Sequence, residues 1–290
     1  MKLARFTHSD RTRLGVVLDD SVADVSAVEA DLPDDVAGVF AAGDGALEAV
    51  RGAADRAPRI ALADVALEAP VARPPKFFGI GLNYADHAAE TGRPPPEHPM
   101  VFNKQSTCVA GPYAPIHAPR VSDALDYEGE LGFVVGRRCR HVPRERAAEA
   151  IGGFCVVNDV SVRDWQLRTP TMTMGKSFDT HGPTGPWVVT SDELGDPHGL
   201  AIRTWVNDEL RQDSNTRELI FDCFALVEHL STAFTLEPGD IVSTGTPAGV
   251  GMAMQPPRKL AAGDVVRVEV ERIGEIRNPV VAEPDDTPRL

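Results

Sequence analysis

Two glutamates separated by a single glycine, Glu128 and Glu130, begin an apolar run that ends at Val135. Residues two apart on a strand point to the same face, so the two carboxylates would lie side by side. Such carboxylates repel each other unless a cation or a base lies between them, and Mg²⁺ or Ca²⁺ takes oxygen ligands of this kind. Asp159 follows the apolar run Phe154–Val157 and is the candidate for a third ligand. The alternatives are a solvated strand face for the glutamates and an ordinary turn for the aspartate.

A histidine and a glutamate follow the strand-like run Phe77–Leu82 and are candidates for activating water. His87 and Glu90 are three residues apart, so a single helical turn would place them on one face. A carboxylate beside an imidazole orients the ring and raises its basicity, which suits a general base. The alternative is an exposed helical turn with ordinary polar side chains.

Two further polar segments are candidates for holding a substrate anion. Lys176 lies between flexible neighbours and is able to bind a carboxylate or an enolate oxygen, with a solvated surface lysine as the alternative. The hydroxyls and N–H groups of residues 244–247 are able to hold an anion or only to shape a turn. The sequence contains no complete phosphate loop, no GxGxxG, no GxSxG and no HExxH, so a serine esterase or a zincin is not supported.

The composition restricts the partners and the compartment. The formal net charge of −14 disfavours nucleic acid or an anionic membrane surface as a partner, because both need a basic footprint. No apolar stretch reaches the length of a membrane span, about 20 residues, and the N-terminus lacks the apolar region of a signal peptide. The four cysteines are sparse and form no CxxC pair, so we expect neither a disulfide scaffold nor structural zinc. These observations predict a cytoplasmic protein that binds neither nucleic acid nor membranes.

The chain divides into a small N-terminal domain, a larger domain and a tail. Residues 1–70 combine short apolar runs with helical apolar spacing between 31 and 63. Three prolines in 69–76 indicate a boundary near residue 70. Residues 71–283 form the predicted catalytic domain, and 284–290 form a polar tail.

Short strands dominate the predicted catalytic domain. Apolar runs predict strands over residues 76–82, 128–135, 154–157 and 187–189. Residues 264–271 alternate valine with charged side chains, which is typical of a half-buried strand. Helices are expected over 144–151 and over 216–234, the second with a capping box made by Asn215 and Glu218.

The order of these motifs resembles the fumarylacetoacetate hydrolase family, over residues 75–281. The motifs that carry the resemblance are Gly81–Glu90 (GxNYxxHxxE), Phe102–Lys104 (FxK), Glu128–Glu130 (ExE), Asn158–Asp164 (NDxSxRD), Gly175–Asp179 (GKSFD) and Gly239–Gly251 (GDxxxTGTPxGVG). One departure is Gln105, where many relatives have proline after the lysine.

The resemblance implies a mainly β, α+β fold: a β-roll with a small N-terminal domain, assembled as a homodimer. It implies that Glu128, Glu130 and Asp159 bind a metal, Mg²⁺ or else Mn²⁺ or Ca²⁺. It also implies a catalytic role for His87, Glu90 and Lys176, and a substrate-binding role for Arg163, Gln166 and Thr246.

The implied activity is metal-dependent hydrolysis of a C–C bond in a small 2,4-dioxo acid, an acylpyruvate or a diketo-deoxy sugar acid. A 2-oxo acid chelates the cation, which stabilises the enolate formed when the C3–C4 bond breaks. The same site would support isomerisation of a 2-hydroxyhepta-2,4-diene-1,7-dioate type of dienol, or decarboxylation of oxaloacetate. A non-catalytic metal-binding scaffold is the alternative of a different class, and the intact dyad of His87 and Glu90 argues against it.

Overall fold

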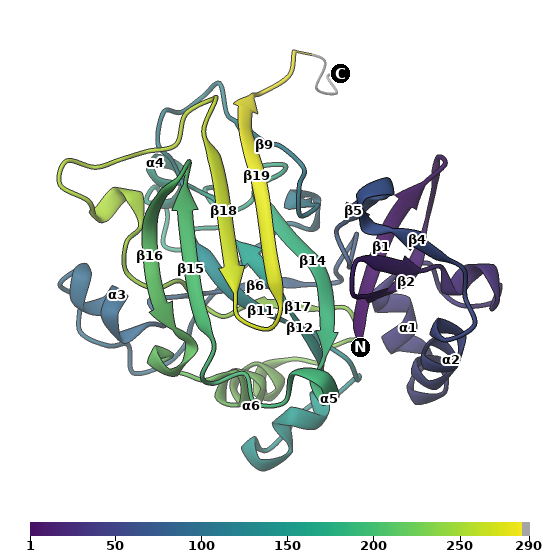
Figure 1. Ribbon diagram of the computed structural model, residues 1–290. Coiled ribbons are helices and arrows are strands. Elements are labelled where there is room, and N and C mark those ends of the chain that lie inside the picture. The colour runs from purple at the N-terminus through teal and green to yellow at the C-terminus, as the bar shows by residue number, and fades with distance from the viewer. Residues whose placement is uncertain (286–290) are drawn as a thin grey trace.

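Short strands joined by turns make up most of the chain, as the sequence predicted (Figure 1). The structure is a computed structural model that describes residues 1–285. Its mixed α+β architecture, in which strands predominate, confirms the predicted fold class. The helices of residues 1–285 include none with the length and apolar character of a membrane-spanning segment.

The N-terminal part, purple to dark blue in Figure 1, mixes strands and helices. It contains β1 (Lys2–His8), β2 (Arg11–Leu18), β3 (Ser21–Ala23), η1 (Val25–Ala27), α1 (Val36–Ala42), α2 (Asp44–Ala54), β4 (Arg59–Ala61), η2 (Leu62–Asp64) and β5 (Ala66–Glu68). The later strands are β6 (Phe77–Gly81), β7 (Met100–Lys104), β8 (Val109–Ala110), β9 (Ile116–Ala118), β10 (Leu125–Asp126), β11 (Gly129–Val135), β12 (Ile151–Asn158), β13 (Ser161–Val162), β14 (Gly182–Thr190), β15 (Ala201–Val206), β16 (Glu209–Asn215), β17 (Ile241–Ser243), β18 (Val265–Val270) and β19 (Gly274–Ala282). The later helical segments are α3 (Ala85–Glu90), η3 (Ser106–Cys108), η4 (Arg144–Ala150), α4 (Arg163–Gln166), α5 (Ser191–Leu194), η5 (Thr216–Glu218), α6 (Cys223–Ala233) and η6 (Gly251–Ala253).

One large sheet, of 12 strands within residues 1–285, runs through both parts of the chain. Its order is β4-β3-β2-β1-β14-β12-β11-β17-β6-β7, with β5 beside β1 and β8 beside β14. The strand β1 pairs antiparallel with β14 through Lys2↔Val189 and Leu3↔Val188. The predicted boundary near residue 70 therefore separates strands that share one sheet. Residues 286–290 of the predicted tail lie outside the described residues.

Alternate residues of β11 contribute to different hydrophobic cores, because successive side chains of a strand point to opposite faces. Phe133 packs in a core with residues of β15 and β18 such as Ile202 and Val268. Val134 packs in a second core with Val36 of α1 and other residues of the N-terminal part. The large sheet is therefore covered by the smaller sheet on one face and by the N-terminal helices on the other.

The smaller sheet has the order β16-β15-β18-β19-β9 and lies in front of the large sheet in Figure 1. In β18 the predicted alternation is confirmed: Val266, Val268 and Val270 are buried, and the residues between them are partly exposed. The valines pack into the core between the two sheets. This packing covers one face of β11 and β12.

The predicted helix over 216–234 is wrong at its N-terminal end. Asn215 does cap a helical turn, but the turn is the short 3-10 helix η5, in which Asn215 accepts a hydrogen bond from the N–H of Arg217. The chain then extends, because the N–H groups of Ile220 and Phe221 donate to Asn83, at 2.8 Å each. The α-helix α6 begins only at Cys223, after its N-cap Asp222. The predicted helix over 144–151 is likewise a 3-10 helix, η4, and Ile151 already belongs to β12.

Candidate metal and active site

The three predicted metal ligands come together at the end of two paired strands. Glu128 lies just before β11, Glu130 lies in β11, and Asp159 directly follows β12. Pairing of Gly129 with Asn158 sets the register, and the N–H of Asp159 donates to the carbonyl of Glu128 at 2.8 Å. One carboxylate oxygen from each residue lies within 4.8 Å of the others, and all three residues are buried. The donor set, three carboxylates, is the kind that hard divalent cations prefer.

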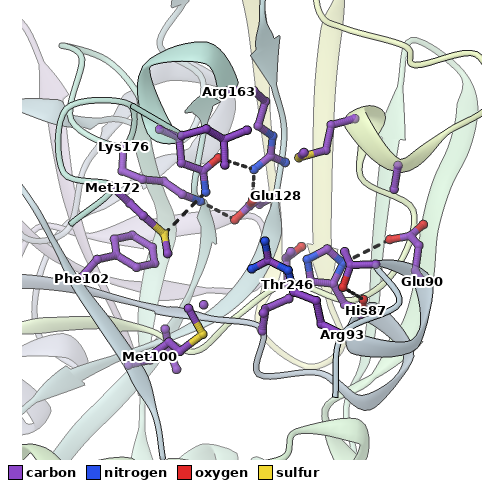
Figure 2. A pocket seen from close by; sticks show the side chains of 18 of the residues that line it. His87, Glu90, Arg93, Met100, Phe102, Glu128, Arg163, Met172, Lys176 and Thr246 are labelled. Carbon is purple, nitrogen blue, oxygen red and sulfur yellow. Dashed lines mark hydrogen bonds and ion pairs between the residues drawn. The ribbon is translucent and has the colours of Figure 1, made fainter. Parts of the chain in front are cut away.

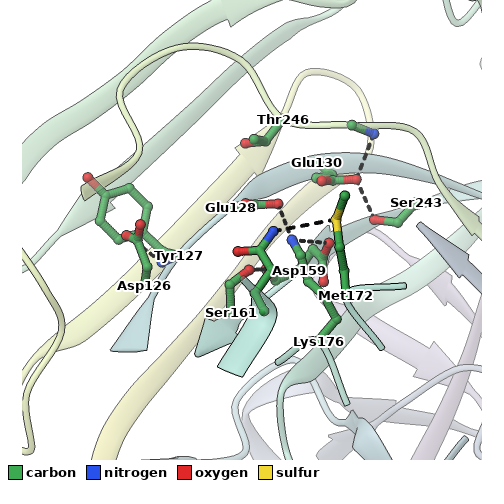
Figure 3. A network of polar contacts seen from close by, with 12 residues as sticks. Asp126, Tyr127, Glu128, Glu130, Asp159, Ser161, Met172, Lys176, Ser243 and Thr246 are labelled. Atoms are coloured by element: carbon green, nitrogen blue, oxygen red, sulfur yellow. Dashed lines mark hydrogen bonds and ion pairs between the residues drawn. The ribbon is translucent and has the colours of Figure 1, made fainter. Parts of the chain in front are cut away.

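The three carboxylates differ in how many positive side chains lie beside them, and Glu130 has none in ion-pair contact within the described residues (Figure 3). Burial and the nearby charges of Asp159 and Glu128 raise the pKa of Glu130 well above its usual value. Glu130 accepts hydrogen bonds from the Ser243 hydroxyl at 2.6 Å and the Gly245 N–H at 2.7 Å, but it has no ion-pair partner within the described residues. A bound cation would supply the missing positive charge, so the residues present fit a divalent metal.

Two buried lysines flank Asp159. The Lys176 Nζ lies 2.6 Å from a Glu128 oxygen and 2.7 Å from the Asp159 Oδ2. The Lys104 Nζ lies 2.7 Å from the other Asp159 oxygen and donates to the carbonyls of Lys176 and His181. Burial would lower the pKa of Lys104, but the negative charge of Asp159 raises it, so Lys104 stays a charged partner of Asp159.

Arg163 connects Glu128 of the carboxylate cluster to Asp126, which contacts the loop around Gly251. Arg163, the first residue of α4, lies 2.5 Å from an oxygen of Glu128 and donates through Nε to Asp126 at 2.8 Å. Asp126 in turn accepts hydrogen bonds from the N–H groups of Gly251 and Met252, at 2.9 Å each. Burial alone would raise the pKa of Glu128, but the charges of Lys176 and Arg163 lower it to about 2. Glu128 is therefore held ionised.

The predicted dyad forms on the short helix α3. The His87 Nδ1 lies 3.1 Å from the Glu90 Oε2, as the three-residue spacing predicted. The second oxygen of Glu90 accepts a hydrogen bond from the Gly249 N–H at 2.9 Å, and Asp86 accepts one from the Ser214 hydroxyl at 2.7 Å. The helix is thus fixed to a loop and to β16, and the dyad keeps one orientation.

A cavity of about 370 Å³ brings these groups together (Figure 2). Of the residues predicted from the sequence, the cavity is lined by His87, Glu90, Glu128, Arg163, Gln166, Lys176 and Thr246. Glu130 and Asp159 do not line the cavity and are fully enclosed. The arrangement offers a base, a cation site and hydrogen-bonding groups around one small space. The individual roles of these residues stay predictions.

Two of the predicted substrate-binding residues are already engaged. The Gln166 amide oxygen accepts a hydrogen bond from Arg163 at 3.0 Å. The Thr246 hydroxyl donates to the carbonyl of Gly129 at 3.0 Å and accepts from Gln212 at 2.8 Å. To donate to a substrate carboxylate, the Thr246 hydroxyl would have to turn away from Gly129.

Several site residues were not assigned roles from the sequence. Asp126 stands two residues before Glu128, so the same two-residue spacing that identified Glu128 and Glu130 extends to it. Lys104 was noted only as a motif residue, and no local signal revealed its contact with Asp159, 55 residues away. The departure at Gln105 has a structural counterpart: its N–H donates to the Ser177 hydroxyl at 3.1 Å, and proline would have no N–H to donate.

Comparison with known proteins assigns the family. Residues 76–281 match the family model of the fumarylacetoacetate hydrolase C-terminal domain. The chain is 41% identical over 288 residues to the mitochondrial oxaloacetate tautomerase fahd2 of Xenopus laevis, covering 97% of this chain and 90% of that protein. The structure of maleylpyruvate hydrolase from Sphingobium sp. SYK-6, in complex with manganese(II) and pyruvate, superposes with a TM-score of 0.82 at 34% identity, over 98% of this chain and 100% of that one. The 2-hydroxyhepta-2,4-diene-1,7-dioate isomerase of Mycobacterium marinum superposes with a TM-score of 0.78 at 33% identity, again over 98% and 100%. The chain belongs to the fumarylacetoacetate hydrolase family, whose named members here include a hydrolase, an isomerase and a tautomerase.

Proposed function

We propose that this enzyme is a metal-dependent hydrolase that breaks the C3–C4 bond of a 2,4-dioxo acid, an acylpyruvate or a diketo-deoxy sugar acid. The observation that carries the proposal is the shared cavity, which His87 and Glu90 line together with Glu128 and Lys176. A candidate base and a candidate cation site therefore face the same small space. The Mn²⁺ and pyruvate in the structure of the maleylpyruvate hydrolase support this reading, since cleavage of an acylpyruvate would release pyruvate.

Glu128, Glu130 and Asp159 would hold the divalent cation. We propose Mg²⁺, with Mn²⁺ or Ca²⁺ as alternatives. When bound, the cation would supply positive charge to the carboxylate and 2-oxo oxygens of the substrate and to the charge that develops there as the bond breaks. Lys176 adds a second positive charge beside the same carboxylates, 2.6 Å from Glu128.

His87 is the proposed base. Its Nδ1 is held by Glu90, which leaves Nε2 to take a proton from water. The hydroxide of that water adds to C4, the C3–C4 bond breaks, and its electron pair stays on C3. The proton held by His87 then passes to C3, so the products are pyruvate and a carboxylic acid. The contact between Glu90 and the Gly249 N–H keeps the imidazole in place during both proton transfers.

Arg163 and Gln166 are proposed to orient the 2-oxo acid end of the substrate. Both line the cavity, and the hydrogen bond between them fixes the guanidinium and the amide relative to each other. Thr246, in the loop 244–251, lines the same cavity and is proposed to form one further hydrogen bond with the substrate.

A proton-transfer reaction without water is the second candidate function. The relatives named as an oxaloacetate tautomerase and as a dienoate isomerase favour it. In that reaction His87 would move a proton between carbon and oxygen, and no hydroxide would form. Oxaloacetate decarboxylation is a third outcome on the same site, in which CO₂ leaves. A non-catalytic scaffold is disfavoured because His87 and Glu90 form their contact inside the cavity.

The predicted homodimer and the predicted cytoplasmic location stay predictions. We propose them together with a small 2-oxo acid as the substrate, and with neither nucleic acid nor a membrane as a partner. The small cavity and the net charge of −14 support the small-molecule substrate and the exclusion of nucleic acid.

A product analysis separates the candidate reactions. Metal-depleted protein is reloaded with Mg²⁺ or Mn²⁺ and incubated with acylpyruvates, a diketo-deoxy sugar acid, oxaloacetate and a dienol. Nuclear magnetic resonance then distinguishes pyruvate plus a free carboxylic acid from a tautomer or isomer and from CO₂ release. Hydrolysis that is lost in His87→Ala supports the proposal. Tautomerisation or isomerisation without cleavage would replace it with the second candidate, and metal binding without any turnover would revive the scaffold.

A further inference from the structure

An arginine whose side chain has no partner within the described residues lines the cavity. The other basic side chains there are each close to a carboxylate: Arg163 and Lys176 to Glu128, and His87 to Glu90. Arg93 differs, because within residues 1–285 its guanidinium takes part in no ion pair or hydrogen bond. Figure 2 shows its side chain turned into the cavity.

Local structure fixes the position of Arg93. The Arg93 N–H donates to the Ala88 carbonyl and the Gly92 N–H to the Ala89 carbonyl, at 3.1 Å each. Gly92 has a φ of +66°, so these two bonds form a Schellman motif at the end of α3. The backbone of Arg93 is therefore held at a defined place relative to His87 and Glu90. Three prolines follow immediately and stiffen the chain as it leaves the motif.

The charge of Arg93 is the one that remains for a ligand. Lys176 and Arg163 are balanced by Glu128, Asp159 and Asp126, so their charge is largely committed to the carboxylate cluster. Arg93 belongs to the segment that follows the dyad. A substrate whose 2-oxo acid end lies at the cluster and whose C4 faces His87 would extend its far end towards this segment.

We propose that Arg93 binds a second carboxylate of the substrate, so that the substrate is a dicarboxylic 2-oxo acid. This inference rests on the proposed function only in placing the 2-oxo acid end at the carboxylate cluster. Arginine is suited to the role because its planar fork forms two parallel hydrogen bonds with a carboxylate. A neutral far end would leave the guanidinium without a partner.

The expected effect is a preference for diacids over monoacids of the same length. A hydrogen bond between charged groups contributes enough for about a 10- to 100-fold change in affinity. Arg93 is exposed to solvent, which weakens the interaction, so we expect the lower end, about tenfold.

The test compares the affinities of two unreactive probes for protein loaded with Mn²⁺, by isothermal titration calorimetry at neutral pH. The probes are 2-oxoheptanedioate and 2-oxoheptanoate, which have seven carbons each and differ only in the terminal carboxylate. Neither has a 4-oxo group, so binding is measured without C–C hydrolysis. The variants are Arg93→Gln, Arg93→Lys and, as a control, Arg73→Gln, which removes an exposed arginine outside the cavity.

The readout is the ratio of the two dissociation constants. We expect a ratio of about ten in the wild type and in Arg73→Gln, an intermediate ratio in Arg93→Lys, and a ratio near one in Arg93→Gln. The proposal is overturned if the wild type shows no diacid preference, or if Arg93→Gln keeps it. Turnover of 2,4-dioxoheptanedioate to pyruvate and succinate is measured separately, so a failure of the hydrolase proposal would leave the result on Arg93 intact.

Discussion

Replacing the two members of the dyad should affect hydrolysis to different extents. Glu90 contacts His87 at 3.1 Å, and its other oxygen accepts from the Gly249 N–H at 2.9 Å. His87→Ala removes the proposed base. Glu90→Gln removes the charge and leaves one oxygen that can still accept from His87, whereas its NH2 group cannot accept from the Gly249 N–H.

The sizes of the two losses follow from these contacts. A general base contributes about 10²- to 10⁴-fold to a rate, so His87→Ala should lower kcat for acylpyruvate cleavage by that factor. A hydrogen bond to a charged group is worth about 1 to 1.5 kcal/mol more than a neutral one, so Glu90→Gln should cost about tenfold. Metal affinity should stay close to that of the wild type in both variants, because neither side chain belongs to the carboxylate cluster.

Turnover is measured from the pyruvate released in fixed-time assays. Metal affinity is measured by titration with Mn²⁺, which electron paramagnetic resonance detects. Decarboxylation of oxaloacetate, which needs no attack by water, serves as the comparison reaction and should suffer less than hydrolysis in His87→Ala. Equal losses in both reactions would refute water activation and assign the dyad to proton shuttling or to ordering the cavity. A large loss of Mn²⁺ affinity in His87→Ala would refute the separation of the dyad from the metal site.

Three further changes test other parts of the site. Removing the metal with a chelator should abolish turnover until Mg²⁺ or Mn²⁺ is added, and full activity of the metal-free protein would contradict the requirement for a metal. Glu128→Gln should weaken Mn²⁺ binding by more than about tenfold, because it removes a charged ligand of the predicted site. The segment 92–99 is predicted to be a lid. Its first two residues, Gly92 and Arg93, are held by the motif at the end of α3, so the amide hydrogen exchange of Glu97 and His98 should slow when oxalate and Mg²⁺ are added, and unchanged exchange would count against a lid. A Cβ at position 175 would lie 2.1 Å from the backbone nitrogen of Gln166, so Gly175→Ala should lower kcat/KM at least about tenfold, whereas Gly45→Ala, with open space around it, should not. Wild-type kinetics of Gly175→Ala would show that the contact between these segments is unimportant.

The strands that carry the predicted metal ligands were predictable because their signals are local. Residues two apart on a strand share a face, which made Glu128 and Glu130 candidates for a cation site, and the apolar run before Asp159 made it the third candidate. The resemblance of the motif order to a known family selected this interpretation over a solvated strand face. His87 and Glu90 are likewise close in sequence, and one turn of the helix α3 brings their side chains to the same face. Each of these features depends on fewer than ten consecutive residues.

The contacts that the sequence did not reveal join segments far apart in the chain. Lys104, at the end of β7, reaches Asp159 after β12 although β11, β17 and β6 lie between these two strands in the sheet, and Asp126 reaches Gly251 across 125 residues. Contacts between distant segments also explain why the α-helix predicted to begin at Thr216 begins only at Cys223. Hydrogen bonds from Ile220 and Phe221 to Asn83, 138 residues away in the case of Phe221, hold the segment extended despite its helical pattern.

The pairing of β1 with β14 has a consequence for how the protein unfolds. Leu3 of β1 and Val188 of β14 are paired, and both belong to the core that also contains Val36 and Val157. Neither part of the chain can therefore expose its share of this core without exposing that of the other. We expect the N-terminal strands and the catalytic sheet to melt in a single cooperative transition, so that a chain shortened to begin at residue 71 would present an uncovered apolar face and an open strand edge, and would self-associate.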